Sequence, residues 1–175
     1  MLISKIETEL GVMIAGSVDE GICMCEFSDR NTLEAEFNEL KIYLKQEISE
    51  GENDHIKNLR FQIDEYFAGT RKSFDIPLVT PGTEFQKRVW NELLNIPYGV
   101  TISYRQQAAA LKNPLSVRAV ASANGMNRIS IIIPCHRVIG SNGSLTGYGG
   151  GLHRKKWLLD HEKRYSGSLF EKTLF

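Results

Sequence analysis

Apolar and polar positions form distinct blocks along the first half of the chain, and these blocks predict both strands and helices. Two apolar runs, residues 11–17 and 22–27, flank turn-forming residues 19–21 and predict a hairpin within a strand-rich region over residues 1–28. Apolar side chains recur at helical spacing after Thr32 and again over residues 56–68. The pattern predicts a small α/β domain with a mainly antiparallel sheet.

Helical patterns dominate the second half. One helix is expected to begin at residues 83–86, and a pair of short helices follows, residues 103–111 and 116–123, separated by the breaker Asn113-Pro114. Two short helices with a tight turn between them are typical of a helix-turn-helix, although paired short helices are also common packing units. The apolar run Ile131–Ile133 predicts a buried strand that Pro134 ends. A last helix is expected over residues 153–162.

Charge divides the chain at the same place as the pattern. Residues 1–80 carry eight Lys or Arg against sixteen Asp or Glu, whereas residues 81–164 carry twelve against four. With Pro81-Gly82 between them, we predict an N-terminal support domain over 1–80, a second domain over 81–164 and a loosely held tail over 165–175. The basic second half is either a differently solvated half or a surface for a polyanion such as nucleic acid.

The cysteine content and the apolar runs indicate the cellular compartment. An odd count of three cysteines, with Cys23 and Cys25 close together, is a poor disulfide framework and favours a reducing compartment. The first residues lack the pattern of a secretory signal, and no apolar run is long enough to span a bilayer. We therefore expect an intracellular protein, cytoplasmic or, in a eukaryote, nuclear.

The candidate chemistry lies in Pro134-Cys135-His136-Arg137. A thiol in a positive neighbourhood has a lowered pKa and becomes nucleophilic, whereas a buried cysteine without one is a small apolar residue, and the residue types alone leave both readings open. On an extended segment Cys135 and His136 point to opposite faces, so proton transfer between them needs a turn or a bridging water. Glu162, one of few acids in this half, is a candidate to orient the imidazole.

The motifs together resemble one known family, the 6-O-alkylguanine-DNA alkyltransferases, also called methylated-DNA–protein-cysteine methyltransferases. The resemblance runs from about Thr83 to Glu162, and the first half is similar only in general pattern. It is carried by Pro134-Cys135-His136-Arg137-Val138, Pro97-Tyr98-Gly99 with Ser103-Tyr104, Arg118-Ala119-Val120, Asn127, Gly147-Tyr148 with Gly150-Gly151-Leu152, Trp157-Leu158-Leu159 and His161-Glu162. It implies a ribonuclease-H-like N-terminal domain and a mainly α, winged-helix-like C-terminal domain with a helix-turn-helix.

The resemblance also implies an activity and a set of site residues. The activity is DNA repair by single-turnover transfer of the methyl group of 6-O-methylguanine, and possibly of 4-O-methylthymine, to Cys135 in duplex DNA. The implied catalytic residues are Cys135, His136, Glu162, Asn127 and Tyr104. The implied DNA contacts are Arg118, Ser116, Ala119, Ser103 and Arg128, and the implied base pocket is formed by Tyr104, Val138, Tyr148, Gly149 and Gly150.

Some features depart from the family or concern cofactors. Gly149 stands where some relatives carry serine, so only a backbone N–H is available there. The zinc ligands of some members are not reproduced, and Cys23 and Cys25 are interpreted as packed strand residues. No metal or other cofactor is expected. The expected partner is double-stranded DNA containing a 6-O-alkylguanine, and the protein is expected to be a monomer.

Two other function classes compete with this one. A cysteine hydrolase would use Cys135 and His136, but their adjacency and the lack of a clear oxyanion motif argue against it. A DNA-binding protein that only senses alkylated guanine would lack the reactive cysteine, which this chain keeps.

Overall fold

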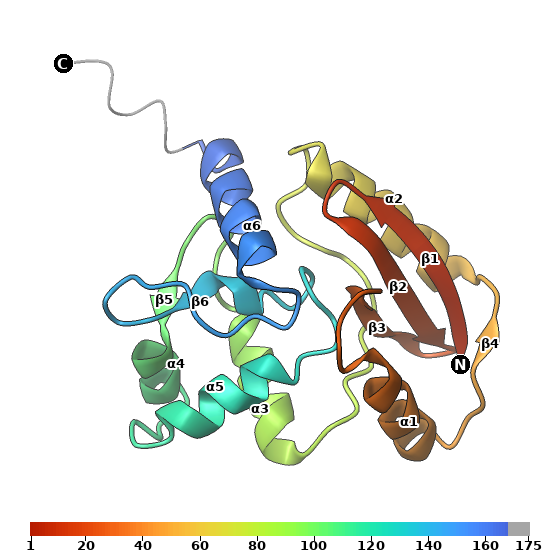
Figure 1. Cartoon of the computed structure of the whole chain (residues 1–175), viewed down its shortest axis with the longest axis horizontal. Helices are drawn as coiled ribbons and strands as arrows, with labels where there is room; N and C mark the ends of the chain where they lie inside the picture. Colours follow the sequence, from red (N-terminus) through yellow and green to blue (C-terminus); the bar gives the residue numbers. More distant parts are fainter. Residues whose placement is uncertain (168–175) are drawn as a thin grey trace. The chain divides into compact units, whose positions relative to one another are not determined.

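The structure is a computed structural model, and it describes residues 1–167. The chain forms two compact units (Figure 1). The first contains Met1–Lys87 and the short segment Arg128–Ile132, and the second contains Arg88–Asn127 and the residues from Ile133 onward. The predicted division at residues 80 and 81 thus falls a few residues before the observed one. In addition, residues 128–132 belong to the first unit, whereas the prediction assigns them to the second domain.

A four-stranded sheet forms the centre of the first unit. Its spatial order is β3-β2-β1-β4, antiparallel from β3 to β1, with the short β4 parallel to β1. The strands are β1 (Leu2–Thr8), β2 (Gly11–Val18), β3 (Gly21–Phe27) and β4 (Ser49–Glu50). The prediction of a mainly antiparallel α/β domain is confirmed.

Two helices accompany this sheet, α1 (Leu33–Leu44) and α2 (Asp54–Phe67). Helix α2 packs on β1 and β2 with one apolar stripe of fully buried residues, namely Ile56, Leu59, Ile63 and Tyr66. Its first turn is capped by Asn53, whose side-chain oxygen accepts a hydrogen bond from the Ile56 N–H. Thr32 precedes α1 as predicted but makes no capping bond; its hydroxyl donates to Glu36 and accepts from the Arg30 guanidinium.

The second unit is mainly helical. Its helices are α3 (Glu84–Leu93), which begins in the first unit, α4 (Tyr104–Ala110), α5 (Val117–Gly125) and α6 (Leu152–Tyr165). A two-stranded parallel sheet joins β5 (Ile102–Ser103) to β6 (Val138–Ile139). Helix α6 continues to Tyr165, and residues 168–175 of the predicted tail lie outside the described residues.

The prediction of a strand over Ile131–Ile133 is wrong. These residues form turns, and Ile131 has a left-handed backbone with φ of 73°. A β-branched residue in that region is strained and cannot continue a strand ladder. All three isoleucines are buried, so the apolar run reflects burial of a turn, which periodicity cannot distinguish from a strand.

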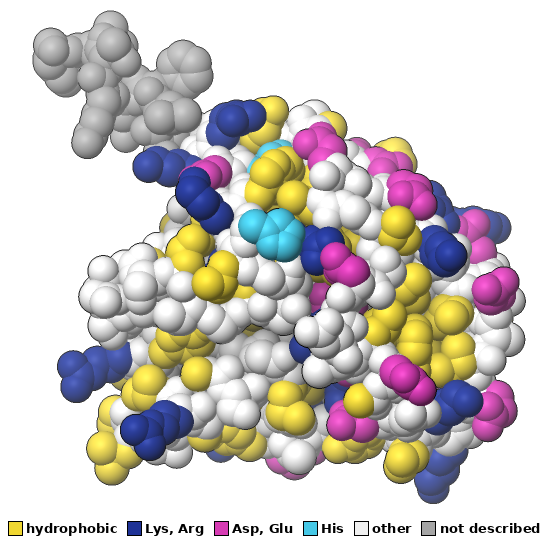
Figure 2. Space-filling view, in the orientation of Figure 1, with side chains coloured by type: hydrophobic (Ala, Val, Ile, Leu, Met, Phe, Trp, Pro, Cys, Tyr) yellow, Lys and Arg dark blue, Asp and Glu magenta, His cyan; other side chains and the backbone are white. Residues whose placement is uncertain are grey.

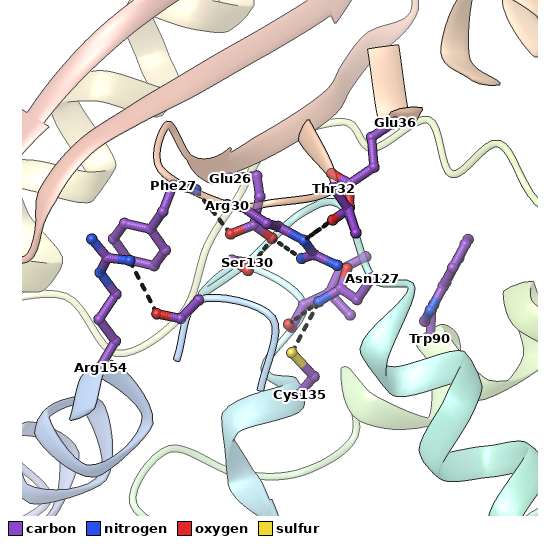
Figure 3. Close-up of polar contacts among 12 residues, drawn as sticks. Glu26, Phe27, Arg30, Thr32, Glu36, Trp90, Asn127, Ser130, Cys135 and Arg154 are labelled. Atoms are coloured by element: carbon purple, nitrogen blue, oxygen red, sulfur yellow. Dashed lines mark hydrogen bonds and ion pairs between the residues drawn. The ribbon is translucent and has the colours of Figure 1, made fainter. Parts of the chain in front are cut away.

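The segment Arg128–Ile132 is fixed to β3 within the first unit. The Cys25 N–H donates to the Arg128 carbonyl at 2.8 Å, and the Ser130 N–H donates to the Cys25 carbonyl at 2.7 Å. The fully buried Glu26 carboxylate accepts the Ser130 hydroxyl at 2.7 Å and the Arg30 guanidinium at 2.5 Å (Figure 3). Burial raises the pKa of Glu26. The chain just before the Cys-His segment is therefore held by both backbone and side-chain bonds.

Candidate active site

Cys135 lies in a single turn of 3-10 helix, η1 (Cys135–Arg137), directly after Pro134. The Cys135 N–H donates to the Ile133 carbonyl at 2.8 Å, and the Arg137 N–H donates to the Pro134 carbonyl at 3.0 Å. Cys135 as a residue is only 6% exposed. Because the segment is a turn, the opposite-face arrangement expected of an extended strand does not apply to Cys135 and His136.

His136, Glu162 and Arg137 form a buried ionic cluster beside this turn. His136 Nε2 lies 2.7 Å from Glu162 Oε1, and both side chains are fully buried. The Arg137 guanidinium donates to both Glu162 oxygens, at 2.9 and 3.0 Å, and to the Ile96 carbonyl at 2.6 Å. The Gly99 N–H donates to Glu162 Oε2 at 3.0 Å. Four donor atoms from two segments of chain, the η1 turn and Gly99, thus hold the carboxylate.

The charges in this cluster can be assigned from the environment. Burial alone would raise the pKa of Glu162, but His136 and the guanidinium of Arg137 hold it well below its usual range. Burial lowers the pKa of His136 although Glu162 opposes the shift. The two directions compete, and since Arg137 is permanently charged we assign an ionised Glu162 and a neutral His136. His136 then donates from Nε2, and its Nδ1 is an acceptor.

Asn127 connects the end of α5 to the thiol. Its side-chain Nδ2 donates to the Ile133 carbonyl at 2.9 Å and to Cys135 Sγ at 3.3 Å (Figure 3). The residue is 1% exposed, so these bonds are shielded from water. An amide N–H directed at the sulfur favours its negative form, because a hydrogen bond to the charged form stabilises that form.

Tyr104 begins α4 and faces the glycine-rich loop. Its hydroxyl donates to the Thr146 carbonyl at 3.0 Å and to the Gly147 carbonyl at 3.3 Å. Burial raises the pKa of Tyr104, so the hydroxyl keeps its proton at neutral pH. Gly147 has φ of 58°, and a Cβ there would lie 3.0 Å from the Tyr104 hydroxyl oxygen, so the close approach of loop and ring favours glycine.

The remaining predicted pocket residues lie on β6 and on this same loop. Val138 is fully buried and Tyr148 is 8% exposed. Gly149 is exposed, whereas Gly150 is buried and its carbonyl accepts the Arg154 guanidinium at 3.0 Å. Tyr104 thus contacts the loop, and Val138 directly follows the turn that carries Cys135.

Helices α4 and α5 form the predicted helix-turn-helix. Ser103 caps α4 in a capping box with Gln106. The two helices are joined by the buried amide pair Gln107 and Asn124, which exchange hydrogen bonds of 3.2 and 2.7 Å. The buried Trp90 indole donates to the Ala123 carbonyl at 2.8 Å. These bonds hold α4 to α5 and α3 to α5.

The predicted DNA contacts divide into surface and buried residues. Arg118 and Ala119 are exposed on α5, and Ser103 and Ser116 are half-buried at the starts of their helices. Arg128 does not fit the prediction. Its side chain is 6% exposed, its guanidinium donates to the Pro81 carbonyl, and it forms an ion pair with Glu39. Arg128 is a structural residue of the first unit, and its buried, paired guanidinium is not available as a DNA contact.

Comparison with known proteins places the chain in a family. Residues 1–80 match the ribonuclease-like domain of 6-O-methylguanine DNA methyltransferases, and residues 84–164 match the DNA binding domain of the same proteins. The chain belongs to the 6-O-methylguanine DNA methyltransferase family. The two matched ranges agree with the N-terminal sheet and the helical second half described above, and the expected family is confirmed.

Proteins and solved structures of this methyltransferase family are similar to the chain. A methylated-DNA–protein-cysteine methyltransferase of Mycobacterium tuberculosis is 56% identical over 58% of this chain, and the match spans 62% of the relative's length. An inducible one of Bacillus subtilis is 48% identical over 67% of this chain and 66% of its own length. A crystal structure of Mycobacterium tuberculosis OGT in complex with DNA has a TM-score of 0.82 and 36% identity, covering 94% of both chains.

Figure 2 shows that Asp and Glu side chains are frequent over the N-terminal unit, whereas Lys and Arg predominate over the second unit on the face in view. The charge asymmetry of the sequence is therefore a surface property.

No helix in residues 1–167 is long and apolar enough to cross a bilayer, and the same residues contain no group of three potential metal ligands. Burial raises the pKa of Cys23 to about 12 and raises that of Cys25 as well, so both thiols are packed and unreactive.

Two members of this site could not be assigned from the sequence. The sequence predicts Arg137 only as part of a positive neighbourhood, whereas in the structure it forms an ion pair with Glu162. Lys155 belongs to the basic run His153–Lys156 at the start of α6, which is typical of a solvated helix face, yet Lys155 is fully buried. The helical spacing of three between Lys155 and the buried Leu158 was the available signal.

Proposed function

We propose that this protein repairs DNA by direct reversal, moving the methyl group of 6-O-methylguanine onto Cys135 in a single turnover. The observation that carries the proposal is the neighbourhood of Cys135. Its sulfur accepts a hydrogen bond from Asn127, and the next residue, His136, is paired with an ionised Glu162. This site belongs to the half of the chain that matches a DNA binding domain.

The proton relay follows from the assigned charges. Glu162 fixes the tautomer of His136 by accepting from Nε2, which leaves the basic Nδ1 to accept a proton. His136 Nδ1 is buried and has no hydrogen-bond partner within residues 1–167, and buried polar atoms of this kind ordinarily have one. A water molecule between Nδ1 and the Cys135 thiol would carry the proton from sulfur to nitrogen and give the thiolate.

The transfer itself is one in-line displacement. The thiolate electron pair forms the S–CH₃ bond while the bond between the methyl carbon and guanine O6 breaks, and the electrons of that bond leave with the guanine as an anion. The Tyr104 hydroxyl, protonated at neutral pH, donates a hydrogen bond to the departing base and lowers the cost of its charge. The product is a thioether, which water does not displace at neutral pH, so the protein acts once and needs no cofactor.

Access to the methyl group requires the damaged nucleotide to leave the duplex. Enzymes that act on a base within duplex DNA flip it into a pocket, which costs unstacking energy. The exposed Arg118 on α5 is the residue we propose to fill the space left in the stack, with Ala119, Ser116 and Ser103 against the backbone. Val138, Tyr148, Gly149 and Gly150 would form the wall around the flipped base. We infer an intracellular monomer that acts on double-stranded DNA.

One experiment tests the proposal. The protein is incubated with duplex DNA that contains a single 6-O-methylguanine, and the intact protein and its peptides are weighed by mass spectrometry. We expect a stoichiometric gain of one methylene unit on the peptide that contains Cys135. The Cys135→Ala variant is the matched control and should leave the DNA methylated.

Other outcomes identify the competing functions. Repeated turnover, or hydrolysis of an ester substrate that depends on Cys135, would indicate a cysteine hydrolase. Tight binding of alkylated DNA without any mass gain would indicate a sensor. Methyl removal by Cys135→Ala would contradict the assignment of the acceptor.

A further inference from the structure

Lys155 of α6 is a fully buried cation that the reaction described above does not use. Lysine is almost never fully buried unless its ammonium has partners, because burying an unpaired charge is costly. The Lys155 Nζ donates to the Val138 carbonyl and to the Thr146 carbonyl, each at 2.6 Å. Val138 directly follows the turn that carries Cys135. Thr146 directly precedes Gly147, the first residue of the glycine-rich loop 147–151, which we call the pocket loop. The ammonium therefore ties the catalytic turn to the pocket loop.

A second donor reaches the same loop carbonyl. The Tyr104 hydroxyl donates to the Thr146 carbonyl at 3.0 Å, and the Lys155 Nζ lies 5.7 Å from the centre of the Tyr104 ring. A carbonyl oxygen has two lone pairs and can accept from both, but a phenol has only one proton to donate. Tyr104 must therefore release the loop carbonyls if its hydroxyl is to donate to a bound base.

We propose that Lys155 is a positioning residue that holds the Thr146 carbonyl and the pocket loop in place while the Tyr104 hydroxyl changes its acceptor from the loop to the departing base. The inference rests on the proposed function, because the new acceptor is the guanine of that reaction. The hydrogen bonds to the Thr146 carbonyl are part-buried, and with Lys155 present this carbonyl keeps a protein donor when Tyr104 leaves it, so the loop stays attached to α6 during the exchange. Without Lys155 the hydroxyl is the only remaining side-chain donor to this carbonyl among residues 1–167.

The charge of Lys155 suits this role. Burial lowers the pKa of Lys155 to about 8, so the ammonium is still mostly protonated at neutral pH and can donate to both carbonyls. The same positive charge lies 5.7 Å from the centre of the Tyr104 ring, whose hydroxyl would donate to the base as negative charge develops on that base. An uncharged side chain of equal length would lose both features.

The experiment compares two reactions of the same thiol in four proteins. Lys155→Met removes the ammonium at nearly constant volume, Lys155→Arg keeps charge and donors, and Lys163→Met on the exposed part of α6 is the matched control. The first reaction is methyl transfer from 6-O-methylguanine in duplex DNA under single-turnover conditions. The second is alkylation of Cys135 by iodoacetamide, which has no departing base and does not need Tyr104.

We expect Lys155→Met to slow methyl transfer by about 10- to 100-fold, the range seen when a reacting geometry is displaced slightly, with a much smaller effect on iodoacetamide alkylation. Lys155→Arg should recover part of the loss, and Lys163→Met should match the wild type. In a Tyr104→Phe background the change Lys155→Met should slow the transfer by a much smaller factor, because the hydroxyl exchange no longer occurs.

The outcomes separate the inference from the function on which it rests. If the wild type transfers no methyl group, the proposed function fails. If the wild type transfers it and Lys155→Met is equally fast, or loses the same factor in both reactions, the positioning role is wrong. Additive losses with Tyr104→Phe would also overturn it. Tryptophan fluorescence checks that each variant is folded, and Lys155→Gln takes the place of Lys155→Met if the latter is not.

Discussion

Removal of the Arg137 guanidinium is the perturbation with the clearest physical consequence. In Arg137→Met the side chain keeps much of its length but loses three hydrogen bonds, two to Glu162 and one to the Ile96 carbonyl. Glu162 is fully buried, and the hydrogen bonds from His136 and the Gly99 N–H would remain. The buried carboxylate would thereby lose the permanently charged guanidinium that is paired with it.

The size of the effect follows from that burial. Breaking a buried ion pair by removing one partner costs about 3–5 kcal/mol in free energy of unfolding, because an uncompensated charge is left inside the protein. We expect a value near the lower end, since Glu162 keeps two donors. Replacing both partners, as in Arg137→Met with Glu162→Gln, should cost less than Arg137→Met alone, because no buried charge remains.

The loss should depend on pH in a defined direction. In the wild type the pKa of Glu162 is held below its usual range, so its contribution to stability is present above the unfolded-state pKa of about 4.3 and is lost only as the pH falls through the lower folded-state value. In Arg137→Met burial is no longer opposed by the guanidinium, and the folded protein takes up a proton at higher pH. The difference in stability should be largest near neutral pH and should narrow in acid.

Urea unfolding followed by tryptophan fluorescence measures this difference. Trp90 and Trp157 both lie in the second unit, which contains Arg137 and Glu162, so the signal reports the relevant part of the chain. Lys156→Met is the control, because its exposed pair with Asp160 should contribute no more than about 1 kcal/mol. An unchanged midpoint for Arg137→Met, or a double variant that is less stable than Arg137→Met, would refute the reasoning.

Three further predictions concern single positions. Asn127→Ala should lower the free energy of unfolding by about 1–3 kcal/mol, because the Ile133 carbonyl loses its buried partner, and should also slow methyl transfer; a normal rate in a stopped-flow assay would argue against an amide contact to the sulfur. Gly99→Ala should destabilise the second unit in thermal melts, because a Cβ there lies 2.7 Å from Ser166 at φ of 75°. Native protein treated with a disulfide reagent near neutral pH should not modify Cys23, whose pKa is about 12; rapid labelling of that thiol would show that it is accessible.

Much of the architecture could be predicted from local pattern. The hairpin at residues 11–27, the helices around residues 33–44 and 54–67, and the two short helices of the helix-turn-helix all follow from periodicity, caps and breakers. These elements are determined by interactions within a few residues, which is why local signals suffice. The apolar run Ile131–Ile133 misled the same reasoning, because burial and strand formation produce the same composition.

The sequence by itself determined the chemical identity of the site: a cysteine followed by histidine and arginine, a distant glutamate, and motifs that identify the family. Only the tertiary structure decided how these groups act. In the folded protein Arg137 pairs with Glu162, and Arg128 points inward to Glu39. Lys155 is buried and donates to the Val138 and Thr146 carbonyls. Charge state and hydrogen-bond partners depend on burial and on contacts between distant segments, and no local pattern in the chain contains that information.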